Sequence, residues 1–355
     1  MGLGVVIAAG DQASAALSDA VWVEVHERMG EMTKYRIRYD LDIHQGDFPR
    51  LAGRSGIDAG DVLAVIARVN GKDSYLVKGP VTGQRIHFQH GVGGSYVEVE
   101  GADSTVRMAR QAQAVIWSDL TDSDAVTQIL GSTPYSFNTD VAGTQASHSE
   151  DKHTLVQRDS DLEFVRRLAR RNGFLFWVDC NSTGTETAHF KRPLTDSTPV
   201  ANLDINIGTN NLGNLDLQWD VERSTSVDAQ ELNLNDKSII DGSVDSSPLN
   251  PLGAESLADI TGDVRSGHLH APVDDAGDLS SRGSGALIES AWFVRATGQT
   301  SVNALGGVLR ANTIVTLRGI GSRHSGKYYV AAVRHVIDTS AHHMEFELLR
   351  NGWGN

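Results

Sequence analysis

The sequence is poor in the residues that make covalent or metal-based scaffolds. It has one cysteine, Cys180, in 355 residues, which excludes an intramolecular disulfide and a zinc site built from several cysteines. No apolar run approaches the roughly 20 residues that a membrane-spanning helix needs. The apolar segment Leu3–Ala9 has no basic residue before it, so we do not expect a signal peptide. These features fit assembly in a reducing cytoplasm.

Basic residues are also in deficit. The chain has 31 Lys and Arg against 45 Asp and Glu, a net charge of −14. Binding to nucleic acid needs clustered cations that displace counterions, so we expect no sequence-specific binding of nucleic acid, and we expect no membrane binding by the chain itself. With 40% hydrophobic and 21% charged residues, the composition is that of a globular protein long enough for two or three cores.

Aromatic residues are missing from one long stretch. Residues 224–285 contain no Phe, Trp or Tyr, and their 11 acidic and 3 basic residues give a net charge of −8. Such a segment has little apolar area to bury. We therefore predict a long acidic arm or loop here, which is mobile in the isolated chain and free to order against a partner.

The best-defined local signal lies at 157–179. Ser160 and Glu163 have capping-box spacing, the last turn is cationic, and Gly173 supplies a left-handed stop before the apolar run 174–178. This pattern predicts a capped helix at 160–172 followed by a buried strand. The helix and cap residues singled out are Ser160, Leu162, Glu163, Val165, Leu168 and Gly173.

Two β-rich regions flank this unit. In the first, period-2 alternation on both sides of a Gly-containing turn predicts a hairpin within 21–39. Three strands follow at 62–67, 74–77 and 95–100, with a tight turn at Asn70-Gly71 between the first two. In the second, strands are predicted at 313–317, 327–333 and 344–349. The two regions share the order of strand, Gly-Lys turn, aromatic strand and Glu-alternating strand. Helices are predicted at 122–130 and over ALIESAWFVRAT, which starts after Gly285.

The sequence thus predicts an α+β fold that is mainly β. Two similar small antiparallel β-barrels flank an α/β region, and the long acidic arm is added to them. We place the N-terminal hairpin and first barrel at 1–104, the α/β region at 105–223, the arm at 224–285, and a helix with the second barrel at 286–355.

No catalytic, metal or cofactor site is predicted. The motif G-x-x-x-x-G-K at 321–327 lacks the Ser or Thr of a P-loop, because Tyr328 follows, and is read as a hairpin turn. The pairs His268-x-His270 and His342-His343 have no third donor on a ligand frame and are expected to be exposed loop histidines. The chain is therefore not expected to be an enzyme.

A resemblance to a known family rests on two motifs. The helix Ser-Asp-Leu-x-Phe-Val-x-Arg-Leu at 160–168, followed by glycine and an aromatic-rich strand, resembles the baseplate hub of contractile tails and injection systems, phage late-control D proteins and VgrG proteins. The ending is similar too, with Leu-Arg-Gly-Ile-Gly at 317–321, Ser-Gly-Lys-Tyr-Tyr-Val at 325–330 and Glu-Phe-Glu-Leu at 345–348. The resemblance covers roughly residues 20–220 and 285–350; the acidic segment departs from it.

The resemblance implies two similar barrels per chain and a homotrimeric ring of six barrels. It implies a structural adaptor between a sixfold tail tube and a threefold spike, carried in a virion tail or injection particle. Its implied partners are itself, the tail tube protein, other baseplate proteins and a separate spike protein, because the chain ends at Asn355 without the OB-fold and spike of VgrG proteins. The strands assigned to barrels and subunit contacts are those of Tyr75, Val97, Val99, Tyr328, Tyr329 and Phe346.

Two readings of other classes stay open at this point. One is a cell-wall-degrading tail enzyme with an unrecognised site, and the other is a stand-alone binding module that uses the acidic arm. The sequence does not distinguish a phage tail from an injection system. It also does not show whether DNA or protein would pass through the central channel of such a ring.

Overall fold

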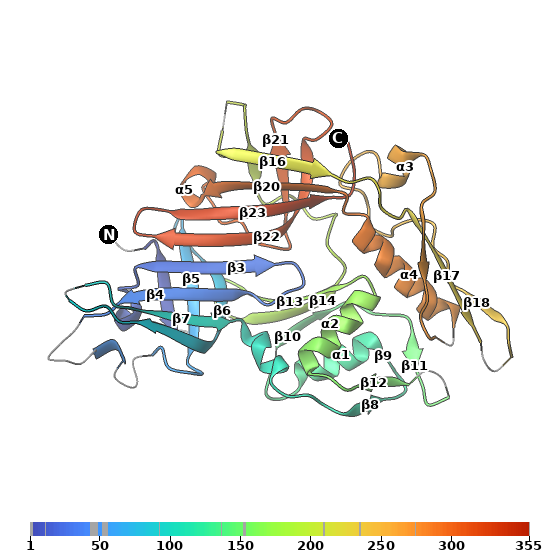
Figure 1. Ribbon diagram of the computed structural model, residues 1–355, viewed down its shortest axis with the longest axis horizontal. Helices are drawn as coiled ribbons and strands as arrows, with labels where there is room; N and C mark the ends of the chain where they lie inside the picture. Colours follow the sequence, from blue (N-terminus) through green and yellow to red (C-terminus); the bar gives the residue numbers. More distant parts are fainter. Residues whose placement is uncertain are drawn as a thin grey trace.

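The computed structural model describes residues 3–10, 12–42, 49–51, 56–91, 93–135, 137–151, 154–208, 210–233, 236–273 and 275–354. The fold is mainly β with few helices, as predicted, and one sheet of 13 strands dominates it (Figure 1). The strands of this sheet are β1 (Val5–Ala9), β2 (Gln12–Ala13), β3 (Trp22–Arg28), β4 (Lys34–Asp40), β5 (Val62–Val69), β6 (Lys72–His87), β7 (Tyr96–Ala102), β15 (Asn202–Asp204), β16 (Asn214–Trp219), β20 (Val294–Ser301), β21 (Ile314–Arg318), β22 (Gly326–Asp338) and β23 (His342–Arg350).

The large sheet consists of two halves with the same strand order. The first half runs β1-β5-β6-β7-β4-β3 and the second runs β15-β21-β22-β23-β20-β16, and corresponding strands also follow one another in the same order along the chain. The similarity predicted between 62–100 and 314–349 is therefore present in β5-β6-β7 and β21-β22-β23. In the first half, Asn70 and Gly71 both have positive φ, as the predicted tight turn between β5 and β6 requires.

The two halves are joined by direct pairing of β22 with β3. Seven residue pairs, from Ala332 opposite Arg28 to Asp338 opposite Trp22, run along this seam. The two small barrels that we predicted are not found as closed barrels among the described residues, in which the strands form one continuous sheet. The physical reason is that each half has an open edge, and the two edges satisfy each other's backbone N–H and C=O groups.

Each half curves around a core of its own. β-Bulges lie in β6 near Val81 and in β22 near Val330, where two residues oppose one and the strand bends. The first core is filled from β3, β4, β5 and β7 by residues such as Ile37 and Val99. The second is filled from β20 to β23 by residues such as Tyr328 and Phe346.

An α/β unit lies between the two halves in the chain. α1 (Asp122–Gly131) and α2 (Asp161–Arg171) pack with the three-stranded sheet β10-β14-β13 around a separate core. β15 and β16, which the sequence assigned to this unit, hydrogen-bond instead to β21 and β20. The other strands of the unit are β8 (Val115–Trp117), β9 (Leu120–Thr121), β10 (Asn138–Val141), β11 (Ser147–His148), β12 (Leu155–Gln157), β13 (Leu175–Cys180) and β14 (Glu186–Lys191), and the 3-10 helices of the chain are η1 (Ala15–Leu17), η2 (Pro49–Leu51) and η3 (Ser104–Ala109).

The acidic segment 224–285 forms a folded unit, called the acidic unit below, so the prediction of an arm or loop is wrong. β17 (Ser226–Leu232), β18 (Ile239–Asp241) and β19 (Ser266–Leu269) form a sheet in the order β18-β17-β19. α3 (Leu257–Thr261) lies in the same stretch of the chain, but its Leu257 packs into the core of the second half of the large sheet. A small aliphatic core, from Val227 and Ala229 to Leu279 and Leu287, replaces the missing aromatics. Residues 234, 235 and 274 of the predicted arm lie outside the described part.

The helix predicted after Gly285 is displaced. α4 spans Ala276–Ser290, capped by the Asp275 side chain, and the residues after it form β20, because Val294 pairs with Arg350 of β23. Glycines inside α4 lower its intrinsic helix propensity, so the sequence pattern did not predict a helix at these residues. Gly285 is needed there: a Cβ on it would lie 2.8 Å from the backbone N of Gly173, at the end of α2. The close contact fixes the acidic unit against the α/β unit. α5 (Val302–Leu305) completes the helices of the described chain.

Candidate functional site

The broadest candidate surface is an eight-stranded layer inside the large sheet. It runs β16-β20-β23-β22-β3-β4-β7-β6 and therefore crosses the seam between the halves (Figure 1). Alternate residues on these strands face away from the two cores. A shallow groove of about 570 Å³ runs over this face from β16 to β3.

Charged side chains on this face are paired across neighbouring strands. The pairs are Arg36–Glu100 (3.1 Å), Arg38–Glu98 (2.7 Å), Arg334–Glu24 (3.0 Å), Arg334–Glu345 (3.0 Å), Arg28–Glu347 (3.2 Å) and Arg295–Glu347 (2.9 Å). The arginine side chains of these pairs are 38–47% exposed, and ion pairs with such access to water each contribute about 1 kcal/mol or less to folding. Their larger effect is to balance charge on this face, although the whole chain carries −14.

A buried ionic network holds the seam behind that face. The Glu27 carboxylate accepts from Arg310 Nε at 2.7 Å and lies 3.2 Å from His335 Nε2. Arg310 also donates to the backbone carbonyls of Tyr75 and Leu76 on β6. Burial opposes ionisation of Glu27, but Arg310 and His335 together hold its pKa below the usual value. This network ties β3, β6 and β22, so it connects both halves.

Behind His335, a second imidazole extends the same network. His342 Nε2 lies 3.0 Å from His335 Nδ1. Burial and the neighbouring histidines lower the pKa of His342 to about 3, so this side chain is neutral at neutral pH.

Two strand edges of the eight-stranded layer are unpaired within the described chain. At one end, residues 83–87 of β6 pair with β7 alone, since β5 and the residues just before it bond only with the part of β6 up to Val81. At the other end, β16 pairs with β20 alone. Both edges carry exposed apolar side chains: Ile86 is 41% exposed and Trp219 is 51% exposed. Open edges with apolar residues are characteristic sites of association.

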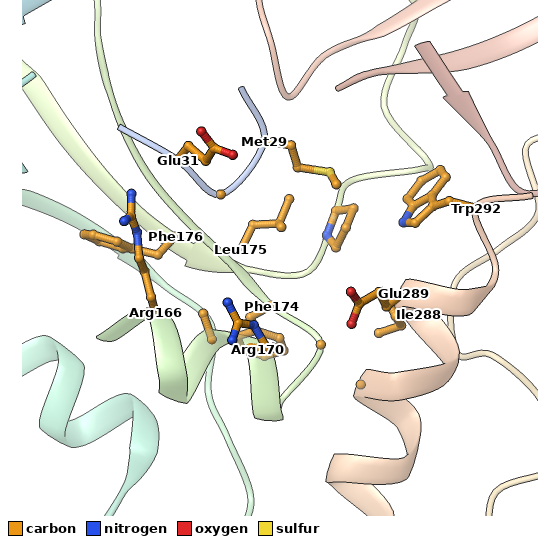
Figure 2. Close-up of a pocket in the computed structure, with 15 residues that line it drawn as sticks. Met29, Glu31, Arg166, Arg170, Phe174, Leu175, Phe176, Ile288, Glu289 and Trp292 are labelled. Carbon is orange, nitrogen blue, oxygen red and sulfur yellow. The ribbon is translucent and has the colours of Figure 1, made fainter. Parts of the chain in front are cut away.

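A cavity of about 290 Å³ lies where three parts of the chain meet (Figure 2). Met29 enters it from the turn between β3 and β4, Arg170 from α2, and Glu289 and Trp292 from the end of α4 and the residues after it. Its walls thus belong to the first half of the sheet, the α/β unit and the acidic unit. The cavity marks the junction of these parts.

The residues singled out for barrel and subunit contacts lie inside the chain. Their exposed fractions are 7% or less, and they are Tyr75, Val97, Val99, Tyr328, Tyr329 and Phe346. All of them are on strands of the large sheet. Subunit contact through these strands stays a prediction, and it would have to use backbone edges or the alternate side chains.

The capped helix is α2, and Ser160 is its N-cap residue. The Ser160 hydroxyl accepts from the Glu163 backbone N–H at 3.3 Å, while the Glu163 carboxylate lies 3.8 Å from Arg166 rather than on the N-cap backbone. Leu162, Val165 and Leu168 are buried. Gly173 has φ of +65°, the left-handed conformation expected after the helix.

Side chains with catalytic potential are dispersed. Among the described residues, no three His, Cys, Asp or Glu side chains form a group that could hold a metal ion. His268 is on β19 and His342 and His343 are on β23, so these three are on strands rather than in loops. Burial raises the pKa of the Cys180 thiol to about 12, which makes it a poor nucleophile at neutral pH. In the described part of the chain, no helix is both long and apolar enough to cross a membrane.

Besides Glu27, two further buried charged groups were missed by the sequence reasoning. Asp122 accepts from Arg171 Nε at 2.6 Å and Asn172 Nδ2 at 2.7 Å, and His148 Nε2 lies 2.8 Å away. Burial opposes its ionisation, but these partners lower its pKa to about 2. Arg350, 0% exposed, donates to several backbone carbonyls. Neither had a sequence signal, because the partners are far away in the chain.

Comparison with known proteins places the chain in a family. Residues 4–339 match the family model described as the Alg8 N-terminal domain. The chain belongs to this family. No curated protein sequence matches it.

Solved structures of phage tail proteins share its fold. The 43 kDa tail protein of prophage MuSo2 from Shewanella oneidensis is 14% identical, with a TM-score of 0.69 and 98% of each chain covered. A tail protein from Neisseria meningitidis MC58 is 13% identical, with a TM-score of 0.65, covering 99% of this chain and 97% of that one.

A third structure comes from a secretion machine. The E. coli c3393 protein, a component of the type VI secretion system with structural similarity to the T4 tail proteins gp27 and gp5, is 14% identical, with a TM-score of 0.61, covering 95% of this chain and 76% of that one. The resemblance to tail and VgrG-like proteins is thus confirmed at the level of the fold.

Proposed function

We propose that this chain is a structural hub protein of a contractile phage tail or a contractile injection particle. The fold it shares with phage tail proteins and a type VI secretion component supports this role. In the proposal, three copies form a ring that joins a sixfold tail tube to a threefold spike.

The observation that carries the proposal is the repeated strand order of the two sheet halves. Three copies in a closed ring would present six similar half-sheets to a tube layer of six subunits while keeping true threefold symmetry towards a spike. The halves already meet head to tail within one chain, through β22 and β3. A ring of three repeats this contact at each subunit boundary.

The proposed partners follow from this geometry. They are two further copies of the chain, the tail tube protein on one side of the ring, a separate spike protein on the other, and other baseplate proteins at the periphery. The chain would assemble in the bacterial cytoplasm and become part of the particle. The balanced charges of the eight-stranded layer suit a channel wall that does not retain its passenger.

We propose that the chain consists of four units with boundaries near residues 104, 223 and 285, with two changes to what each unit contains. β15 and β16 are grouped with the second sheet half, with which they pair, and the acidic unit extends through α4. Limited proteolysis would test it: cuts should fall in the connections between these units and leave each core intact.

Light scattering on the purified protein, alone and with the spike protein encoded beside it, tests the ring. Three copies of the chain contribute about three times 38.2 kDa, to which a bound spike protein adds its own mass. A protein that stays a monomer under both conditions and binds neither tube nor spike protein would contradict the hub proposal.

The enzyme reading makes the opposite prediction about activity. We propose a non-enzymatic role, so purified protein incubated with bacterial cell walls should release no reducing sugar or muropeptide above a heat-denatured control. Release that a single Asp or Glu substitution abolishes would support a cell-wall-degrading enzyme instead.

A further inference from the structure

The repeated strand order allows the two halves to be aligned residue by residue. In β6, Arg85 is opposite Glu98 of β7; in β22, Arg334 is opposite Glu345 of β23. Both pairs lie just beyond a bulge, and both are ion pairs, at 3.9 Å and 3.0 Å. Arg85 is therefore the counterpart of Arg334.

The same alignment relates β16 to β3. Glu24 of β3 is opposite Arg36 of β4, which is opposite Glu100 of β7. Asp216 of β16 is opposite Thr297 of β20, which is opposite Glu347 of β23. Since Glu100 and Glu347 occupy equivalent positions next to the bulges, Asp216 is the counterpart of Glu24.

Within one chain, the counterparts meet at the seam. Arg334 and Glu24 form an ion pair at 3.0 Å between β22 and β3. Arg85 and Asp216 lie at the two opposite ends of the eight-stranded layer, on the unpaired edges. The Arg85 side chain is 72% exposed, and Asp216 is exposed and carries the opposite charge.

The core-facing side chains of the two edges show the same relation. His335 and Glu27, which the seam covers, are 0% and 5% exposed. Their counterparts in the alignment are Ile86 and Trp219, which are 41% and 51% exposed. Where the seam buries a polar pair, the open edges thus leave an apolar pair uncovered. Burial of such apolar surface favours association.

We propose that β6 of one copy pairs with β16 of the next in the antiparallel register of the seam. Arg85 then forms an ion pair with Asp216 of the neighbouring copy, and Ile86 and Trp219 become buried. His87 is placed directly opposite Asp216, as Val336 is opposite Glu24. The proposal rests on the ring of the proposed function and adds the strands, the register and the charged pair that close it.

Charge reversal tests the ion pair by light scattering over a range of protein concentrations. Arg85→Glu and Asp216→Arg should each weaken assembly about tenfold or more, because like charges then face each other at every boundary. The double variant, which restores opposite charges, should recover the assembly of the parent. Arg36→Glu is the matched control: it breaks an exposed ion pair of the same layer, with Glu100, away from both edges, and should leave the mass unchanged.

Cross-linking tests the register independently of the ion pair. Directly opposite residues of antiparallel strands have Cα atoms about 4.5–5.5 Å apart, within the range of a disulfide. In a Cys180→Ser background, His87→Cys with Asp216→Cys should give covalent trimers on oxidation, and neither single cysteine should.

The outcomes separate this inference from the hub proposal. A trimer that is indifferent to both charge reversals and gives no cross-link has other contacts, which overturns the register and leaves the ring standing. A parent protein that remains monomeric, alone and with the spike protein, overturns both. Circular dichroism and thermal melting of each variant establish that a loss of assembly is not a loss of folding.

Discussion

The two halves of the large sheet share a strand order but differ in what is placed between equivalent strands. β3 and β4 are joined by a short turn at 29–33, whereas their counterparts β16 and β20 are separated by residues 220–293. The acidic unit is thus an insertion in one hairpin of the second half. A hairpin end outside the core tolerates such growth, because the flanking strands keep their pairing.

The halves also differ at equivalent buried positions. Asp103 follows β7 in the first half and accepts from the backbone N–H groups of Thr33 and Thr105. Arg350, at the aligned position in the second half, donates to backbone carbonyls. At this position each half therefore has a buried charge that is satisfied by backbone groups, but the two charges have opposite signs. A shared strand order therefore does not require shared polar contacts.

The largest expected effect is at the buried Arg350 of the second half. Arg350→Met should lower the free energy of unfolding by about 3–5 kcal/mol, because the carbonyls of Leu252, His324 and Ser325 lose a buried donor. Urea denaturation measures the loss. A variant as stable as the parent would show that water replaces the guanidinium and that these carbonyls do not need a charged donor.

Matched core substitutions test whether the halves unfold together. Leu63 on β5 and Leu317 on β21 are each 0% exposed, so Leu63→Ala and Leu317→Ala should each cost about 2–5 kcal/mol. Because the sheet is continuous through the seam, both losses should appear in the same transition. The control Leu232→Ala, at a side chain 48% exposed, should change stability by less than about 0.5 kcal/mol. Two separate transitions would show that the halves are independent folding units.

The seam itself can be weakened through Glu27. Glu27→Gln should cost about 2 kcal/mol at neutral pH, because Arg310 and His335 lose a charged acceptor. The folded pKa of Glu27 lies below its ordinary value near 4.5, so its contribution is present above that pH and is lost as pH falls through the folded pKa. The difference between parent and variant should shrink on acidification below about pH 4.5. A difference that is constant with pH would mean that the charge of Glu27 is not what holds the seam.

The smallest effect concerns the α/β unit that links the halves. Ser160→Ala should lower stability by about 1 kcal/mol through loss of the N-cap of α2, and Ser160→Asp should retain it. Thermal melting of the two variants measures the difference. Equal melting temperatures for the Ala and Asp variants would show that a capping side chain at residue 160 does not stabilise α2.

The sequence by itself determined the elements whose signals are local. The cap at Ser160, the stop at Gly173 and the turn at Asn70-Gly71 depend on neighbours within a few residues, and each lies where the pattern placed it. The likeness of the two β regions was also visible, because equivalent strands keep their order and alternation. Local patterns determine which backbone conformations are accessible, and period-2 patterns determine which face of a strand is buried.

Only the tertiary structure decided how these elements combine. Nothing local to β22 or β3 specifies that they pair across some 300 residues, and this pairing converts two expected barrels into one sheet. The glycines of α4 lower helix propensity, yet Gly285 is required because α2 lies against it. The buried charges of Glu27, Asp122 and Arg350 have partners distant in the chain. Long-range pairing and close packing outweigh local preference here, because the free energy of burial is gained only when the distant surfaces meet.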